Sequence, residues 1–426
     1  MTTPQARVTT LANGVRVVTL ALPHLESASA SVFVRTGSAC ESARESGISH
    51  VVEHMAFKGT ASRDCQQINL DAERLGAEVN AHTDKDHTAF HMRGLARHAT
   101  DFVRMLGDIV CASTFPEAEL ERERQVILHE VDEDDDDPLS TAFKLFDRAC
   151  YGNHPVAQPV IGRRGNIERF TRGDILSYVQ RQYTGRNIVV GVAGAIDAQA
   201  VDAAAEAAFG ALPEGEVNRV TAPVYAGGVR LKRQAGSSQT HAVIGFPIPT
   251  LADDDAASEV AAALFGEGMS SPLMDALRER RALVYYAACS ADRTPWSGQF
   301  VIEASTAPRH LDELVAEVAR LLVAQTRGVD AVGLERAHNQ LAVRRVQALE
   351  RPSRLLEEAA LDLFVHGRVR SRDELAARIA AVNADGVRAA FARMLAATPA
   401  VAVAGRLGKG LQAGQRLGEL LAAGRA

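Results

Sequence analysis

One short run, His50-Val51-Val52-Glu53-His54, constrains this chain more than any other stretch. On an α-helix His50 and His54 lie one turn apart on the same face, and Glu53 projects beside them. Two imidazoles and a carboxylate then converge on one point, as Zn²⁺-assisted hydrolysis requires. With 13 histidines in the chain, a chance match on a core helix is the alternative. A metal site therefore needs a further ligand elsewhere in the sequence.

The composition limits the class of protein. A chain of 426 residues exceeds one ordinary hydrophobic core, so we expect two or more domains. Its 46% hydrophobic and 23% charged residues are typical of a soluble globular protein. The net charge of −6 argues against a nucleic-acid partner, because the phosphate backbone is bound through a basic surface.

Neither a membrane segment nor an export signal is expected. No run approaches the ~20 apolar residues of a membrane helix. The polar N-terminus is followed by a predicted strand at residues 15–22 rather than by an apolar signal core. The five cysteines are scattered, odd in number and without a CxxC pair, which indicates a reducing compartment. We therefore expect a cytoplasmic protein with no membrane partner.

Strands and helices mix in the first half of the chain. The strand predictions rest on β-branched and apolar runs. The predicted C-terminal ends of helices rest on glycines such as Gly76. The predicted order is strand 8–19, strand 28–35, the histidine helix, helix 66–75, a hairpin of 78–83 and 87–93, helix 98–112, a helix beginning near 114, and the buried strand 187–195.

The helix that begins near residue 114 carries two glutamates on one face. Glu123 and Glu130 are seven residues apart, about two turns, with Val126 and Ile127 between them on the same face. Two carboxylates on an apolar stripe are costly to bury unless each has a cationic or metal partner. A metal site would supply that partner. The acidic run 132–137 that follows is expected to be solvated surface, with attraction of basic peptides as the functional alternative.

The second half repeats the element order of the first. Residues 215–228 have linker composition, so we predict domains at 1–214 and 229–426. After the linker come two strands, a helix, a Gly break, a helix capped by Ser271 with Pro272 at its first position, and a strand pair. This order matches residues 46–93 and predicts a duplication. The histidines are not repeated, so metal chemistry belongs to the first half.

These motifs together resemble the pitrilysin family of zinc peptidases, and within it the short two-domain members similar to the processing-peptidase β subunit. The family's inverted zincin signature is H-x-x-E-H. The resemblance implies that His50, His54 and Glu130 hold one Zn²⁺ per chain, that Glu53 is the general base and that Glu123 supports the site. The likeness rests on His50-x-x-Glu53-His54 followed by Met55-Ala56-Phe57-Lys58-Gly59-Thr60, and on Glu123-Arg-x-Val-Ile-Leu-x-Glu130, 76 residues after His54.

The same resemblance implies residues that bind substrate. Asn80-Ala81-His82-Thr83 is similar to the edge strand that pairs with the peptide backbone. Arg278 and Tyr285 resemble the arginine–tyrosine pair that contacts peptide opposite the zinc and helps hold the oxyanion. Pro272 and Ala282 depart from the family pattern, in place of a basic residue and a glycine, which bears on substrate fit more than on activity.

The fold and assembly follow from the resemblance as expectations. It implies an α+β fold of two homologous domains, each a mostly antiparallel sheet flanked by helices. The expected function is zinc-dependent endopeptidase action on extended oligopeptides, precursors or leader peptides inside a chamber of four such domains. Because one chain supplies two domains and both halves of the machinery, we expect a homodimer, with a heterodimer of related subunits as the alternative.

Several other interpretations remain open. The chain is alternatively a structural subunit on the same fold, or a peptide-binding chamber that captures without cutting. Asp132 or Glu133 would replace Glu130 as third ligand only if the helix were out of register. The neighbouring histidines are expected to be surface or supporting residues rather than ligands: His82, His87, His91 and His129.

Overall fold

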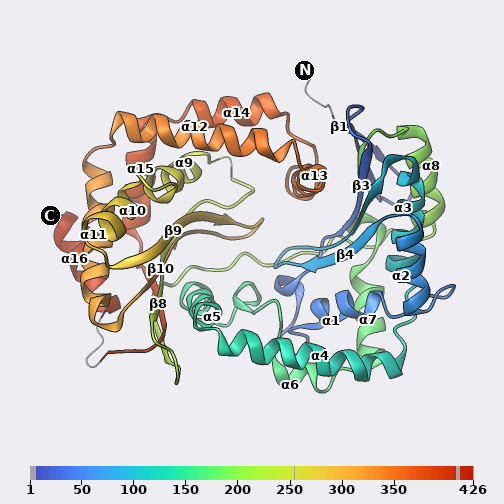
Figure 1. The fold of residues 1–426 in the computed structure, drawn as a ribbon, viewed down its shortest axis with the longest axis horizontal. Helices are drawn as coiled ribbons and strands as arrows, with labels where there is room; N and C mark the ends of the chain where they lie inside the picture. Colours follow the sequence, from blue (N-terminus) through green and yellow to red (C-terminus); the bar gives the residue numbers. More distant parts are fainter. Residues whose placement is uncertain (1–5, 254, 409–412, 426) are drawn as a thin grey trace. The chain divides into compact units, whose positions relative to one another are not determined.

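The computed structural model describes residues 6–253, 255–408 and 413–425, which divide into two compact units (Figure 1). The first unit comprises Met1–Val131, Pro159–Val220 and Val346–Arg372. The second comprises Asp132–Gln158, Thr221–Arg345 and Asp373–Ala426. Each unit combines one sheet with several helices, so the predicted α+β class is confirmed. Among the described helices, none is long and apolar enough to cross a membrane.

The first unit is built on a six-stranded sheet in the order β1-β2-β6-β3-β5-β4. Only the β2–β6 pair is parallel, and the other neighbours are antiparallel. The predicted hairpin is confirmed as β4 paired with β5. The strands are β1 Ala6–Thr10, β2 Arg16–Ala21, β3 Ser27–Val34, β4 Glu78–Thr83, β5 Thr88–Leu95 and β6 Ile188–Gly194.

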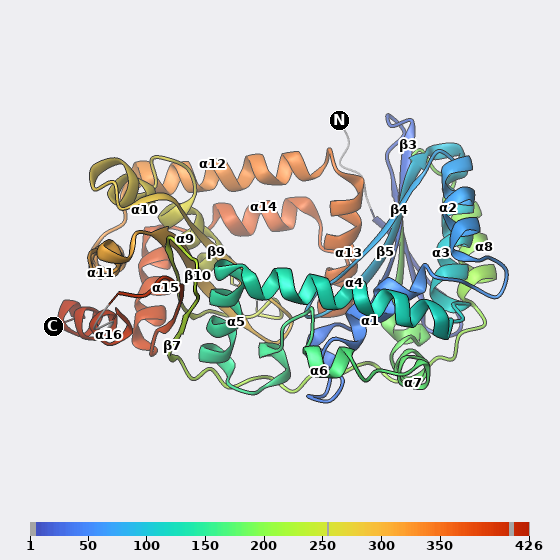
Figure 2. The ribbon, with the colours of Figure 1, turned by 60° about the horizontal axis from the view of Figure 1, so that its bottom comes forward.

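Side-chain alternation divides this sheet between two cores. Along β3, Val32 and Val34 belong to the core that includes the histidine helix, and Phe33 points to a smaller core on the other face. Both views show α3 and α8 on one face and α13 on the other (Figures 1 and 2). The helices with most of their length in this unit are α1 Ile48–Ala56, α2 Cys65–Arg74, α3 Ala99–Cys111, α4 Glu117–Asp136, α6 Arg164–Ile167, α7 Arg172–Gln182, α8 Ala198–Phe209 and α13 Pro352–His366.

The second unit repeats this topology in a five-stranded sheet ordered β7-β11-β8-β10-β9. Its strands correspond in order to β2, β6, β3, β5 and β4 of the first sheet. The parallel pair β7–β11 corresponds to the parallel pair β2–β6. The strands are β7 Gly228–Arg233, β8 Thr240–Pro247, β9 Val284–Arg293, β10 Gly298–Thr306 and β11 Ala400–Gly405. The helices are α5 Pro138–Tyr151, α9 Ala257–Gly266, α10 Pro272–Met274, α11 Leu311–Arg327, α12 Ala331–Ala348, α14 Arg372–Ala380, α15 Ala384–Ala396 and α16 Ala413–Arg425.

The two halves of the chain exchange one helix each. Helix α5 comes from the first half but packs on β7, β8 and β11, and α13 comes from the second half but packs on β2, β3 and β6. Both exchanged helices follow a long helix and begin with proline at the first turn. The duplication therefore includes this reciprocal exchange, which the order of elements along the sequence does not reveal. The predicted division at 1–214, 215–228 and 229–426 stays a prediction.

Helix α13 is fastened to its sheet by apolar and polar contacts. Leu356 is fully buried and lies against Gly191 of β6. The guanidinium of Arg16 donates to the carbonyl of Leu363 at 2.6 Å and lies 5.3 Å from the ring centroid of Phe364. A helix from residue 352 onward is therefore an integral part of the unit that contains the histidine helix.

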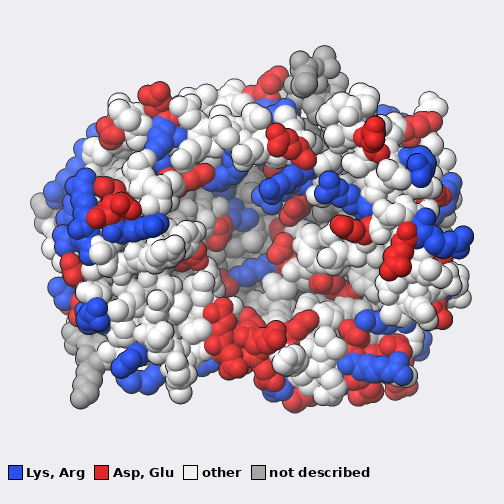
Figure 3. All heavy atoms as spheres, in the orientation of Figure 1, with Lys and Arg blue, Asp and Glu red and all other residues white. Residues whose placement is uncertain are grey.

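The acidic run is solvated, as expected, but it is also helical. It extends α4 to Asp136, and Lys144 of α5 pairs with Asp134 and, at 2.7 Å, with Asp135. Figure 3 shows acidic side chains gathered at the bottom of the view, where Figure 1 places α4.

Candidate metal and catalytic site

The histidine motif lies on α1, as predicted, with one face in the core. Ile48, Val51, Val52 and Met55 are buried among the residues that pack on the sheet. His50, Glu53 and His54 lie on the remaining face and are only partly buried. The apolar spacing thus fixes which way the histidines point.

The N-terminal end of α1 is capped by a buried carboxylate that no local sequence pattern indicates. Glu41 accepts hydrogen bonds from the backbone amides of Gly47 and Ser49, both at 2.8 Å. These amides have no partner within the helix, and the helix dipole favours a negative group here. Burial raises the pKa of Glu41 to about 7, against the lowering effect of these hydrogen bonds. At Gly47, φ is 103° and a Cβ would lie 2.8 Å from the Cα of Gly162, so the entry to the helix requires glycine.

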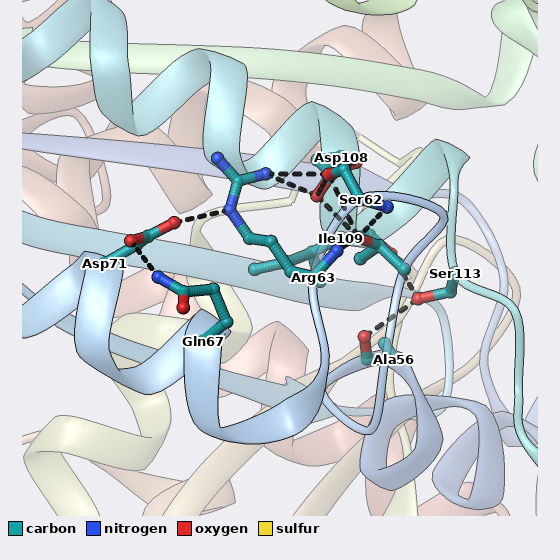
Figure 4. Close-up of polar contacts among 9 residues, drawn as sticks. Ala56, Ser62, Arg63, Gln67, Asp71, Asp108, Ile109 and Ser113 are labelled. Atoms are coloured by element: carbon teal, nitrogen blue, oxygen red, sulfur yellow. Dashed lines mark hydrogen bonds and ion pairs between the residues drawn. The ribbon is translucent and has the colours of Figure 1, made fainter.

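The C-terminal end of α1 is tied to α3 by a polar network (Figure 4). The single hydroxyl proton of Ser113 is shared between the carbonyls of Ala56 and Ile109, which lie 2.8 and 2.7 Å from its Oγ. Arg63 bridges the carboxylates of Asp71 and Asp108, at 2.7 and 2.6 Å. The helix that carries the motif is therefore held at both ends by side chains outside the motif.

Three side chains converge as the sequence predicted. His50 and His54 of α1 and Glu130 of α4 place one ligand atom each within 4.8 Å of one another. The Nε2 atoms of His50 and His54 lie 3.6 and 3.4 Å from the same Glu130 oxygen. Their ring centroids are 4.6 Å apart. The register of α4 is the expected one, so neither Asp132 nor Glu133 replaces Glu130 in this cluster.

Glu123 supports the cluster from the same face of α4. One carboxylate oxygen lies 3.1 Å from Nδ1 of His54, and the other lies 2.7 Å from the Lys58 ammonium. A carboxylate on Nδ1 fixes the tautomer that turns an unprotonated Nε2 toward a metal. Of the two apolar residues between the glutamates, Ile127 is buried and Val126 is 46% exposed, so the apolar stripe is buried only in part.

The residues present fit a Zn²⁺ ion. Two imidazoles and one carboxylate form a donor set of the kind found in catalytic zinc sites, which leave a position open. Burial and the neighbouring His54 lower the pKa of His50 to about 4, so its ring is neutral, as a ligand must be.

Glu53 lies beside this cluster and does not belong to the ligand set. Thr83 of β4 donates its hydroxyl to Oε2 of Glu53 at 2.6 Å. Burial raises the pKa of Glu53, and the hydrogen bond from Thr83 together with nearby His54 and His82 opposes that rise. A partly desolvated carboxylate next to a metal site is placed to act as a base.

The strand β4 is an edge strand, and its open side begins next to Glu53. The amide of Asp84 donates to the carbonyl of His87, which makes these two residues a hydrogen-bonded pair of the hairpin. Because hydrogen-bonded and non-hydrogen-bonded pairs alternate in an antiparallel ladder, His82 and Asn80 are also hydrogen-bonded to β5. The amide of Ala81, between them, therefore points away from β5. That outward amide is covered by the Asn80 side chain, whose oxygen accepts from it at 2.8 Å. One backbone donor on the open edge is therefore occupied by a side chain that can be displaced.

Arg278 and Tyr285 lie together in the second unit. The Arg278 guanidinium is 4.9 Å from the Tyr285 ring centroid, and Tyr285 is 82% exposed. Ala282 has φ of 50°, in the left-handed region, which explains why glycine suits this position. Pro272 begins α10, with Ser271 as its cap, as expected. The role of the pair in binding peptide stays a prediction.

The supporting residues outside the motif had weak sequence signals. Thr83 and Lys58 lie inside runs that the resemblance quotes, but their partners are 30 and 65 residues away in sequence. Glu41 lies nine residues before His50 with no helical pattern connecting them. Such contacts depend on tertiary structure.

The sequence of the chain matches two parts of one peptidase family. Residues 16–164 match Insulinase (Peptidase family M16), and residues 169–341 match the Peptidase M16 inactive domain. Two relatives are named uncharacterized zinc proteases: one of Rickettsia felis is 30% identical over 89% of this chain and 92% of its own, and one of Mycobacterium tuberculosis is 31% identical over 94% and 93%. The chain belongs to peptidase family M16. This confirms the resemblance to the pitrilysin-type zinc peptidases.

Solved structures confirm the fold. A protease from Helicobacter pylori has a TM-score of 0.86 at 21% identity, covering 94% of this chain and 99% of that one. A structure from Pseudomonas fluorescens described as a peptidase M16 inactive domain also has a TM-score of 0.86, at 19% identity, covering 95% and 99%. A chain of complex III₂ from Candida albicans matches with a TM-score of 0.86 at 17% identity, covering 98% and 100%.

Proposed function

We propose that this protein is a zinc-dependent endopeptidase that hydrolyses extended, unfolded peptides such as oligopeptides, precursors or leader segments. The observation that carries the proposal is the convergence of His50, His54 and Glu130, with Glu53 beside them and outside the ligand set. A structural site would use its donors to close the coordination, whereas this arrangement leaves an open position next to a base.

The residues of the site divide the chemistry between them. Bound Zn²⁺ would supply Lewis acidity to the attacking water and to the scissile carbonyl. Glu53 accepts the proton of that water and later returns it to the leaving amine. Thr83 holds the Glu53 carboxylate in place, and Glu123 holds the His54 ring. None of these residues recognises a side chain of the substrate.

The open edge of β4 supports the choice of extended peptides. A peptide that adds as a strand would displace the Asn80 side chain and take the outward amide of Ala81. Thr83 on the same strand touches Glu53, so a peptide in this register passes the base. Because the contacts are to backbone, they fix an extended conformation and exclude folded proteins.

The assembly is proposed from the family resemblance. A homodimer would let Arg278 and Tyr285 of one chain complete the peptide site of its partner and close a chamber of four domains. The exposed, mutually stacked pair is consistent with a surface that contacts another molecule. A heterodimer with a related subunit is the alternative assembly, and the proposed location is the cytoplasm.

A second candidate function is a non-catalytic subunit on the same fold. It is favoured by the fold likeness to a chain of complex III₂ and to a peptidase M16 inactive domain. Against it, this chain holds the three metal donors in one cluster, with the proposed base Glu53 beside them. Retention of all four residues supports the peptidase.

Metal removal tests the proposal. The protein stripped with a chelator should lose cleavage of a mixed pool of unstructured peptides, read by mass spectrometry, and regain it with Zn²⁺ but not with Mg²⁺. Cleavage that survives complete metal removal would contradict the proposal. Zinc-loaded protein that cuts nothing would favour the non-catalytic subunit, unless a related subunit restores cleavage, which would identify the heterodimer.

A further inference from the structure

A second cluster of metal-type ligands lies on the other face of the first unit's sheet. His82 of β4, Asp84 and His87 of the following turn, and Glu357 of α13 place one ligand atom each within 4.8 Å of one another. His87 packs near Phe33, whose side chain belongs to the core under α13. The side chains of His82 and Thr83 point to opposite faces of β4, so this cluster and Glu53 are separated by the sheet.

The central residue is a buried histidine with an unused nitrogen. His87 is 2% exposed, and its Nε2 is buried without a hydrogen-bond partner among the described residues. The nearest carboxylate oxygens, on Asp84 and Glu357, are 3.9 and 4.0 Å away, beyond hydrogen-bonding distance. A buried polar atom left in this way is costly unless something else binds it.

The Nδ1 atom of His87 contacts a carboxylate, as the non-coordinating nitrogen of a metal-binding histidine commonly does. Its Nδ1 lies 2.9 Å from Asp86, whose side chain is largely buried. This carboxylate–histidine pair repeats the relation of Glu123 to His54 in the first site. A carboxylate on Nδ1 directs the lone pair of Nε2 toward a cation.

Charge and geometry also favour a cation. Asp84, Asp86 and Glu357 surround one imidazole; Arg354 lies 3.8 Å from Glu357 and is 61% exposed, and the charge of Arg35 acts on Asp86. A tetrahedral zinc site needs donor separations of about 3.4 Å. The present separations, all within 4.8 Å, need to shrink by about 1.4 Å at most, and the side chain of Asp84 is 57% exposed.

The backbone of the turn is already fixed for this role. Ser38 and Ala39 donate their amides to the carbonyls of Asp84 and Lys85 at 3.2 and 2.9 Å. A Cβ on Gly37 would lie only 2.1 Å from the Asp84 carbonyl, so this close approach requires glycine. The ligands on the turn are therefore positioned before any cation binds.

We propose that His82, Asp84, His87 and Glu357 form a second, structural site for a divalent transition cation of the Zn²⁺ type. Two imidazoles and two carboxylates match the ligand preference of that class, and four donors close the coordination. The site ties the exchanged helix α13 to the hairpin that carries the peptide-binding edge. This replaces the sequence-based expectation that His82 and His87 are surface or supporting residues, and it does not rest on the proposed peptidase activity.

Metal stoichiometry of the full chain tests the proposal. After stripping and reloading with Zn²⁺, we expect two equivalents in the unaltered protein, measured by inductively coupled plasma mass spectrometry. The Glu357→Gln and Asp84→Asn variants should hold one. Glu358→Gln, a neighbouring carboxylate that also faces Arg354, is the matched control and should hold two. Far-UV circular dichroism checks that each variant is folded.

A second measurement separates this site from the first. In the double variant His50→Gln/His54→Gln, one equivalent of Co²⁺ should bind and give the visible absorption of tetrahedral coordination, and adding Glu357→Gln should abolish it. One equivalent in the unaltered protein and none in the double variant would overturn the second site and leave the first intact. Two equivalents in the double variant would instead count against the first site and the proposed function.

Discussion

Glu41 shows how one buried side chain sets the starting point of the histidine helix α1. Its carboxylate takes the amides of Gly47 and Ser49, and Ser49 precedes the first histidine. The hydroxyls of Tyr178 and Ser49 are hydrogen-bonded at 2.8 Å. Burial is the main cause of the raised pKa of Glu41, and the negative charge of Glu45 raises it further. The orientation of His50 therefore depends on a residue that touches no metal and no substrate.

The raised pKa of Glu41 predicts a pH-dependent stability. Its folded-state pKa of about 7 exceeds the ordinary 4.5, so the folded chain binds this proton more tightly than the unfolded chain. The contribution to stability is therefore greatest below about pH 4.5 and is lost as the pH rises to about 7, by about 3 kcal/mol at most. Glu41→Gln removes this dependence, so the variant should gain stability relative to the unaltered protein between pH 5 and pH 8.

Thermal unfolding of the metal-free protein across this pH range measures the effect. Glu73→Gln, an exposed carboxylate of α2 whose charge does not contribute to the pKa shift of Glu41, is the control and should leave the pH dependence of the midpoint in place. A Glu41→Gln variant that loses stability relative to the unaltered protein as the pH rises would show that the carboxylate ionises readily in the fold.

Glu123 predicts a change in metal affinity. Glu123→Gln keeps the shape but weakens the acceptor on Nδ1 of His54 and leaves Lys58 without its ion pair. We expect Zn²⁺ affinity at this site to fall roughly 10- to 100-fold. Competition with a chromogenic chelator, in the Glu357→Gln background, measures it. The control variant Glu121→Gln, at an exposed position of the same helix, should bind Zn²⁺ with unchanged affinity. An unchanged Zn²⁺ affinity in Glu123→Gln would mean that another group orients His54.

At the scale of elements, β4 contributes to both faces of its sheet. Its residues alternate between the face of α1, where Thr83 holds Glu53, and the face of α13, where His82 lies 5.5 Å from His87 between ring centroids. Its outer edge is unpaired among the described strands. The same strand therefore contributes to the surroundings of both clusters.

Strand addition predicts that the outward amide of Ala81 matters. Ala81→Pro removes that donor without removing a sheet hydrogen bond, because the amide points away from β5. Loss of one backbone hydrogen bond should lower kcat/KM about 10-fold. Ala81→Val keeps the amide and should cut nearly as well. Equal kcat/KM for Ala81→Pro and the unaltered protein, with equal zinc content, would exclude strand addition at this edge.

At the scale of the whole molecule, the exchange of α5 and α13 makes each unit depend on both halves of the chain. Leu356 of α13 is fully buried on the sheet of the first unit, and Leu341 of α12 is buried in the core of the second. These two leucines are 15 residues apart and belong to different units. They offer a matched pair for testing the exchange.

Leu356→Ala should destabilise the first unit by about 2–5 kcal/mol, from the cavity that it leaves. Hydrogen exchange read by mass spectrometry should show lost protection in β3 and β6, with β8 and β10 unchanged. Leu341→Ala should give the reverse pattern. Loss of protection in β8 but not in β3 of the Leu356→Ala variant would contradict the exchanged packing.

The parts of the site that local spacing encodes were predictable from the sequence. His50, Glu53 and His54 follow from helical periodicity, and Glu123 and Glu130 from a seven-residue spacing on one helix. Glu41, Thr83 and Glu357 were not predictable in this way, because their contacts join segments that are 8 to 275 residues apart in sequence. The duplication was visible as element order, but the exchange of α5 and α13 was not, since an amphipathic helix does not encode which of two similar sheets it covers.

Glu53→Gln tests the central claim most directly. The substitution keeps the size of the side chain and its contact with Thr83 but removes the base, while His50, His54 and Glu130 are untouched. We predict that the variant holds as much zinc as the unaltered protein and cuts a mixed peptide pool at least ~10³-fold more slowly, within the range expected for loss of a general base. Cleavage at the unaltered rate by a zinc-loaded Glu53→Gln protein would contradict this account.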